Sequence, residues 1–194
     1  RLLAGRAGGK GSGGFNGIAQ ATREGRRNMP VISFVQPKGG AGKSTAALVL
    51  ATELAKGSKV TLIDADPNRP MVKWQKRGGE AANLTIVEND DEVALLDDIR
   101  AAAQTTPFVL VDLEGTRNLA NAYAISMSDF VVIPCQGSTL DSDEASRAVR
   151  LIRNEETRLG RSIPHAIMLT KISPAIRTRT LKHIEDDFIA GEVD

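Results

Sequence analysis

The sequence predicts an α/β fold in which a mostly parallel sheet carries helices on both faces. Short apolar runs alternate along the chain with segments of helical spacing, which is typical of repeated strand–helix units. The runs are almost continuously apolar, as expected of strands that are covered on both faces. Three of them end in loops rich in glycine or aspartate, and open α/β sheets bind their ligands beyond the carboxyl ends of the strands.

The composition limits the class of protein. A chain of 194 residues with 41% hydrophobic and 25% charged residues is long enough for one globular domain with a sizeable core. The single cysteine, Cys135, excludes an intramolecular disulfide and indicates a reducing compartment. No apolar run reaches the 18 residues that a membrane span needs. We therefore expect a cytoplasmic protein with no membrane partner.

The charge divides the chain into two parts. Residues 1–28 are rich in glycine and carry six Lys or Arg against one acid, whereas the rest carries 19 basic and 23 acidic residues. We expect residues 1–28 to be a flexible basic arm, or a segment added upstream of the fold. Residues 29–194 are expected to form the folded domain. Because that domain is mildly acidic, any affinity for DNA must come from local patches.

The elements follow in order from apolar spacing and from glycine, proline and acidic residues. The predicted strands are 31–35, 60–63, 84–87, 108–111, 130–133 and 165–169. The predicted helices are 44–56, a short one containing Val72 and Trp74, 91–104, 119–127, 140–159, and a last one containing residues 181–189. Gly57 and Gly160 are placed to end two of these helices, acids favour the start at 91, and Pro134 is expected to stop a strand.

The segment from Gln36 to Thr45 is the most informative part of the sequence. It lies between a predicted strand and a predicted helix, which is the context of a phosphate-binding loop. Its glycines let backbone N–H groups close on a polyphosphate, and the helix start adds further N–H groups. Lys43 would reach the β- and γ-phosphates, and the Ser44 hydroxyl would ligate Mg²⁺. The predicted nucleotide-binding residues here are Lys38, Gly39, Gly40, Ala41, Gly42, Lys43, Ser44 and Thr45.

Two acidic loops follow other strands. Asp112 ends the run 108–111 and matches a Walker B aspartate, which would hold Mg²⁺ together with the phosphates. Asp64 and Asp66 follow the run 60–63 and lie before Pro67. Two carboxylates on one loop can have different roles. A bound cation stabilises the charged form of one, and the other remains able to accept a proton. The alternative for Asp66 is that it only caps the turn.

The loop departs from the usual spacing, because Pro37 stands where a glycine is common and Lys38 adds a second lysine. Lys-Gly-Gly-Ala-Gly-Lys-Ser is a deviant Walker A motif, and the segment resembles the ParA/MinD family of P-loop ATPases. The resemblance implies ATP and Mg²⁺ as cofactors, and a catalytic role for Lys38, Lys43 and Asp66. Lys38 would reach the phosphates across a nucleotide-dependent homodimer, with Asp64 near Mg²⁺ and Thr170 against the base.

A narrower resemblance rests on Asp64-Ala65-Asp66-Pro67-Asn68-Arg69-Pro70 with Trp74 beyond it. It is similar to ParA-like ATPases of rhizobial and agrobacterial plasmids, including the VirC type that acts in DNA transfer. Family members usually continue through another strand and helix, so the chain looks truncated or short after residue 194. Where the family often has Asp-Thr-Pro-Pro, this chain has Asp112-Leu-Glu-Gly115, which leaves the sensor of the γ-phosphate unidentified.

A basic stretch near the end is a candidate for contact with DNA. No acid lies between His165 and Ile184, while basic residues accumulate. Because no aromatic residue interleaves with them, contact with the duplex backbone is more plausible than base stacking. A solvated basic helix face is the alternative reading. The candidate DNA-binding residues are Lys171, Arg177, Arg179 and Lys182.

Together these features predict an ATPase that dimerises with ATP, binds duplex DNA non-specifically, and partitions or positions a plasmid or DNA-transfer complex. An adaptor or cargo protein is the expected partner. One alternative is a metabolic P-loop enzyme of the cobyrinate-synthase type, for which the chain leaves little room. Another is a MinD-like ATPase that acts on a protein partner. Its membrane-binding form is disfavoured, since residues 185–194 are acidic.

Overall fold

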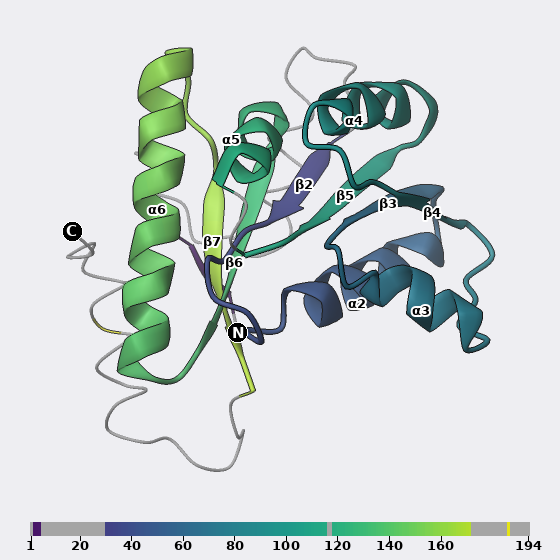
Figure 1. Cartoon of the computed structure of the whole chain (residues 1–194), viewed down its shortest axis with the longest axis horizontal. Helices are drawn as coiled ribbons and strands as arrows, with labels where there is room; N and C mark the ends of the chain where they lie inside the picture. The colour runs from purple at the N-terminus through teal and green to yellow at the C-terminus, as the bar shows by residue number, and fades with distance from the viewer. Residues whose placement is uncertain (1, 5–29, 116–117, 172–185, 187–194) are drawn as a thin grey trace.

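A seven-stranded sheet organises the chain in the order β1-β7-β6-β2-β5-β3-β4 (Figure 1). The computed structural model describes residues 2–4, 30–115, 118–171 and 186. The strands are β1 (Leu2–Ala4), β2 (Val31–Phe34), β3 (Val60–Ala65), β4 (Leu84–Glu88), β5 (Phe108–Leu113), β6 (Phe130–Gln136) and β7 (His165–Thr170). Strands β2 to β7 pair in parallel, and this confirms the predicted fold class.

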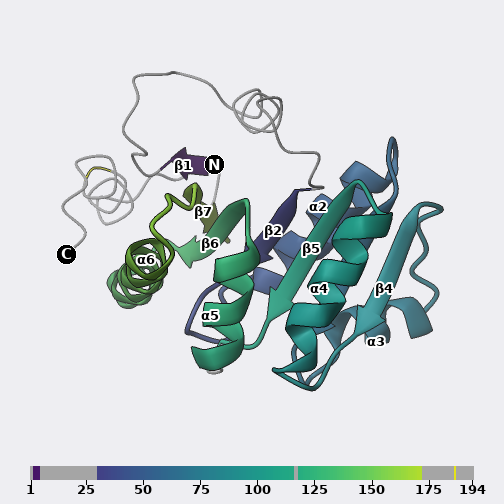
Figure 2. The same ribbon diagram turned by 90° about the horizontal axis from the view of Figure 1, so that it is seen from above.

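Helices cover both faces of the sheet. Figure 2 shows α2 on one side and α4, α5 and α6 on the other. The first face packs Ala47 and Ala51 of α2 against Leu62 and Leu110 of the sheet, and the second face packs a separate cluster around Ile99. The helices are α2 (Lys43–Ala55), α3 (Pro70–Lys76), α4 (Ala94–Thr105), α5 (Asn118–Met127) and α6 (Thr139–Leu159).

Two elements, α4 and β6, differ from their predicted bounds by three residues, which is more than the others do. Helix α4 begins at Ala94 rather than at 91, because Asp91 forms a turn in which its Oδ1 accepts the N–H groups of Val93 and Ala94. Strand β6 continues through Pro134 to Gln136. Since β6 pairs with β2 only as far as Val132, the missing N–H of Pro134 costs no hydrogen bond of the ladder.

Strand β1 lies within the segment that we expected to be an arm. Leu2–Ala4 pairs antiparallel with Ala166–Met168 of β7 and covers that edge of the sheet. The division between an arm at 1–28 and a domain at 29–194 otherwise stays a prediction. The predicted helix containing residues 181–189 lies outside the described residues, apart from residue 186.

Helix α3 and the turn after it hold the indole of Trp74. A Cβ at Gly79 would lie 2.2 Å from the Trp74 ring, so a glycine is needed for the indole to lie against this turn. The ring borders a pocket of about 320 Å³ between α3 and the edge strand β4. Among the described helices, none combines the length and the apolar character that crossing a membrane requires.

Candidate functional site

The phosphate-binding loop joins β2 to α2. Gly40 and Gly42 have φ of 79° and 95°, in the left-handed region that glycine adopts without strain. Gly42 is also the N-cap of α2, and no side chain caps the helix there. The N–H groups of the first turn are therefore not used by a capping side chain, and the positive end of the helix dipole faces the loop. This arrangement suits a phosphate group.

Lys43 is the first residue of α2 and is almost completely buried, with 6% of its surface exposed. Burial lowers the pKa of its ammonium group, and the charges of Asp112, Asp66 and Glu114 oppose this change. These acids compensate the charge of Lys43 in the nucleotide-free chain, and a phosphate group at the loop would add a further negative partner. Lys43 is therefore placed to meet an anion at the loop.

Asp112 lies at the carboxyl end of β5 with no exposed surface. Burial raises the pKa of its carboxyl group to about 7; the charges of Asp64 and Asp66 add to the rise, while the neighbouring Ser44 hydroxyl and Lys43 oppose it. Neither of its oxygens accepts a well-formed hydrogen bond among the described residues, although the Ser44 hydroxyl lies near enough to lower the pKa. A buried carboxylate with two unused oxygens is a natural ligand for a hard divalent cation.

Asp64 faces Asp112 across the β3–β5 ladder. Its Oδ2 accepts the N–H groups of Met71 and Val72 at 3.0 and 3.2 Å, which caps the start of α3. Its Oδ1 is buried without a partner in the described structure. Burial is the main cause of the raised pKa of this carboxyl group. One oxygen of Asp64 therefore holds a helix, and the other is left buried without a partner in the described structure.

Asp66 forms a local turn in this structure. Its Oδ1 accepts the backbone N–H of Asn68 at 2.8 Å and the Asn68 side-chain amide at 2.9 Å. The next residue but two, Arg69, has a φ of 49° and forms an ion pair with Glu88 at 2.7 Å. The turn-capping role is thus present, and its role toward a water molecule stays a prediction.

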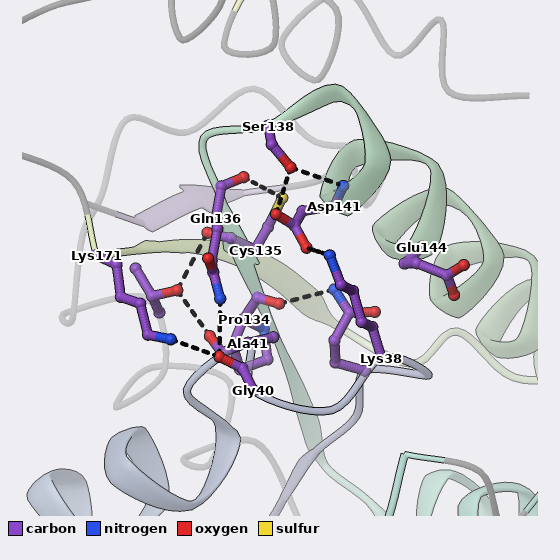
Figure 3. Close-up of polar contacts among 12 residues, drawn as sticks. Lys38, Gly40, Ala41, Pro134, Cys135, Gln136, Ser138, Asp141, Glu144 and Lys171 are labelled. Carbon is purple, nitrogen blue, oxygen red and sulfur yellow. Dashed lines mark hydrogen bonds and ion pairs between the residues drawn. The ribbon is translucent and has the colours of Figure 1, made fainter.

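Lys38 is paired within its own chain. Its ammonium donates to Asp141 Oδ1 at 2.8 Å, and Asp141 is buried with 3% of its side chain exposed (Figure 3). The Ser138 hydroxyl donates to the other oxygen. Burial acts to raise the pKa of Asp141, but the hydrogen bonds from Lys38 and Ser138 and the charges of Lys38 and Lys171 outweigh it, so the pKa is lowered.

The ends of β6 and β7 hold the phosphate-binding loop from the other side, as Figure 3 shows. Gly40 O accepts from Gln136 Nε2 and from Lys171 Nζ, both at 2.7 Å. The Thr170 hydroxyl donates to Ala41 O at 2.7 Å. Thr170, which we expected to lie against the base, is therefore in contact with the loop itself. Lys171, expected in a DNA-binding stretch, is bonded to the same loop.

The other candidate residues divide as follows. Gly39, Ala41, Ser44 and Thr45 lie where the motif predicts them, in the loop and the first turn of α2. Arg177, Arg179 and Lys182 lie outside the described residues. Among the residues described, no group of three or more His, Cys, Asp or Glu side chains could hold a metal ion alone. A cation here would need phosphate oxygens as well, which is how Mg²⁺ commonly binds.

Sequence reasoning missed two further contacts of the loop. A Cβ at Gly115 would lie 2.5 Å from the carbonyl oxygen of Pro37, so the segment after β5 packs directly on the loop backbone. Gln36 Nε2 donates to Pro134 O at 2.9 Å and joins the loop to β6. The departure of Asp112-Leu-Glu-Gly115 from the usual motif is the signal that could have identified Gly115.

Comparison with known proteins agrees with this site. A family model described as VirC1 protein matches residues 29–190. The chain belongs to the VirC1 protein family. A protein named ParA from Rhizobium radiobacter is 39% identical over 167 residues, which cover 86% of this chain and 75% of that protein. This confirms the resemblance to VirC-type ParA-like ATPases that the segment Asp64–Pro70 indicated.

Solved structures share the fold of this VirC1-family chain. A plasmid partition protein of Borrelia burgdorferi, bound to AMPPNP, has a TM-score of 0.62 at 21% identity, covering 81% of this chain and 79% of that one. Cobyrinic acid a,c-diamide synthase from Mycobacterium smegmatis, with an ATP analogue and magnesium, has a TM-score of 0.64 at 18% identity, covering 82% and 78%. Because partition proteins and metabolic enzymes share this fold, the fold alone does not separate them.

Proposed function

We propose that the chain is a Mg²⁺-dependent ATPase that dimerises with ATP, binds duplex DNA non-specifically, and partitions or positions a plasmid or a DNA-transfer complex. The observation that carries the ATPase part is the closeness of two buried charges beside the glycine loop, the ammonium of Lys43 and the carboxylate of Asp112, whose oxygens have no hydrogen-bond partner among the described residues. The VirC1 and ParA relatives support the partition or transfer role over the metabolic one.

The residues fit the expected cofactors. The loop N–H groups and Lys43 would bind the phosphates, and Ser44 and Asp112 would hold Mg²⁺ with them. Bound Mg²⁺ would neutralise charge on the phosphates. Asp66 would orient or deprotonate the attacking water once its Oδ1 is released from Asn68, a bond that is partly exposed and easily exchanged for water. Occupation by a cation would also remove the cost of leaving the Asp112 oxygens unpartnered.

Lys38 is the residue that we expect to reach the partner's phosphates in a dimer. In the structure its ammonium is held by Asp141 of the same chain, with 44% of the Lys38 side chain exposed. A role across a dimer requires this ion pair to open or to be shared with the partner's phosphates. Because Asp141 is buried, opening this pair costs more than opening a surface ion pair, and the contacts of Lys38 with the nucleotide would have to offset that cost.

Nucleotide binding is tested first. Lys43→Ala should weaken ATP binding about 100-fold, because two hydrogen bonds from one ammonium to phosphates are worth roughly 3 kcal/mol together. Calorimetric titration with Mg²⁺·ATP measures this, with the exposed Lys73→Ala on α3 as the matched control. Asp66→Ala should keep binding and lose hydrolysis. Equal affinities in wild type and Lys43→Ala would remove the ATPase proposal.

Dimerisation and DNA binding form the second test. With a non-hydrolysable ATP analogue, light scattering should show a dimer for wild type and a monomer for Lys38→Ala, which still binds nucleotide. Duplex binding should strengthen with the analogue, since a dimer offers two basic patches to one duplex. A variant with Arg23, Arg26 and Arg27 changed to Gln controls for the basic N-terminal segment. If this control binds DNA equally with analogue and with ADP, an ATPase acting on a protein partner is the better reading.

A further inference from the structure

We propose that Lys171 is a positioning residue that, together with Gln136, sets the phosphate-binding loop in the conformation that receives a polyphosphate. The inference rests on the proposed function, because the ligand is the polyphosphate of a nucleotide. It assigns to Lys171 a role at the nucleotide, acting through the Gly40 carbonyl rather than by touching the phosphates.

The backbone of Lys171 is the first observation. It follows β7 directly and has a φ of 52°, a conformation that non-glycine residues rarely adopt. Such a conformation costs free energy and persists only where contacts enforce it. Here the turn brings the ammonium to 2.7 Å from Gly40 O, although the two residues are 131 positions apart in the sequence and β6 separates β7 from β2 in the sheet.

The second observation is that the loop carbonyls are held by side chains. Gly40 O accepts two donors, Lys171 Nζ and Gln136 Nε2, and Ala41 O accepts the Thr170 hydroxyl. These donors come from the ends of two strands that were not expected to build the loop (Figure 3). The loop is therefore oriented by β6 and β7 as well as by its own sequence.

Because each peptide group is planar, a hydrogen bond that fixes the direction of a carbonyl also fixes the direction of the N–H group of the next residue. In a trans peptide the C=O of one residue and the N–H of the next point to opposite sides. With the Gly40 carbonyl directed at Lys171 and Gln136, the Ala41 N–H points away from them. With the Ala41 carbonyl directed at Thr170, the Gly42 N–H points away as well. These are two of the N–H groups that a phosphate-binding loop offers to its ligand.

Glycine alone cannot fix this orientation. Gly40 and Gly42 adopt positive and negative φ with similar ease, so the peptides between them can turn over at little cost. If a peptide turns over, it presents a carbonyl oxygen to the phosphate in place of an N–H. The charged donor on Gly40 O selects one orientation before the nucleotide arrives, which removes an ordering cost from binding.

Calorimetric titration of wild type, Lys171→Met, Gln136→Leu and the double variant with Mg²⁺·ATP and Mg²⁺·ADP tests the proposal. Each single change should weaken both nucleotides about tenfold, the loss expected for one hydrogen bond to a charged or well-oriented donor. The double variant should lose clearly less than the product of the two single losses, because both donors act on one carbonyl. Lys171→Arg should restore most of the affinity.

Lys59→Met changes an exposed lysine that precedes β3, at the amino ends of the strands and away from the loop, and should leave both affinities unchanged. The nucleotide-free Tm of Lys171→Met should stay within about 2 °C of wild type. If the loss of affinity in the double variant equals the product of the two single-variant losses, Lys171 contacts the phosphates directly and the proposal is overturned. A large fall in nucleotide-free Tm without rescue by arginine would also overturn it, as would affinities that do not change. If wild type bound neither nucleotide, the proposed function itself would fail, and this inference with it.

Discussion

The two sides of the phosphate-binding loop are built in opposite ways. On the side of β6 and β7, the Gly40 and Ala41 carbonyls each accept side-chain hydrogen bonds, and Lys38 is paired with Asp141. On the side of β3 and β5, Asp64 and Asp112 keep three buried carboxylate oxygens without a partner in the described structure. Lys43 lies between the two sides, buried and facing the acids.

The hydrogen bonds of the first side are formed within the chain, whereas the carboxylate oxygens of the second side are available to a ligand. Satisfied contacts on the first side fix the loop and contribute stability. Unsatisfied carboxylates on the second side cost stability, since buried polar groups normally find a partner. Removing the part-buried Thr170 hydroxyl on the first side should therefore weaken the nucleotide-free fold slightly, whereas neutralising Asp112 on the second side should strengthen it.

The largest effect is expected on the acidic side. The pKa of Asp112 is about 7 in the folded chain against an ordinary 3.8. Between about pH 4 and pH 7 the folded state keeps a proton that the unfolded state has lost, so the free energy of unfolding falls as the pH rises through this window. Asp112→Asn should therefore be more stable than wild type at about pH 8 by a few kcal/mol, and similar near pH 4.

Urea unfolding with EDTA across this pH range measures the difference, since EDTA removes any divalent cation that would satisfy the carboxylates. Asp143→Asn, which changes an exposed acid on α6, is the control and should follow the wild-type profile. An Asp112→Asn profile parallel to that of wild type would mean that Asp112 already has a partner, and the contrast between the two sides would disappear.

A steric change at the boundary between the sides should have the next largest effect. Gly115→Ala places a methyl group 2.5 Å from the Pro37 carbonyl oxygen, and relief requires the loop or the segment after β5 to move. We expect about 2 kcal/mol of destabilisation by urea unfolding, with weaker ATP binding. Gly57→Ala has open space and should be neutral or slightly stabilising. Equal behaviour of the two variants would show that the loop is not packed against Gly115.

The smallest effect is expected on the satisfied side. Thr170→Val keeps the shape of the side chain and removes the hydroxyl bond to Ala41 O. The free energy of unfolding should fall by about 1 kcal/mol, with little dependence on pH. Thr85→Val, an exposed threonine on β4, is the matched control and should change little. A stabilised Thr170→Val would show that the bond to Ala41 O does not stabilise the fold, and the contrast between the two sides would then be wrong.

The sequence predicted the order of the strands and helices from Val31 to Thr170. Each strand is a nearly continuous apolar run, and glycine, proline or acidic residues mark the loops between the elements. The sequence also brought the right groups to one edge of the sheet, since parallel strands place their carboxyl ends together. Lys43 and Asp112 are buried side by side as the motifs required. These features depend on local patterns that a single sequence displays.

The rest depends on contacts between distant segments. Strand β1 has three residues, too few for any periodic signal, and it is defined only by its pairing with β7. The extension of β6 past Pro134 depends on where the neighbouring β2 ends. Residue spacing does not predict where side chains point. For this reason it could not show that Asp64 caps α3 or that Lys171 bonds to Gly40.

The packing of Trp74 on Gly79 has a practical consequence. Trp74 is the single tryptophan of the chain, so its fluorescence comes from one place. Its helix is held at the start by Asp64, whose other oxygen is buried without a partner in the described structure, and the glycine turn holds the indole at the other end. Movement of α3 that follows a change of partners at Asp64 would alter the surroundings of this ring. The chain thus carries its own optical reporter of events at the acidic side, with no dye attached.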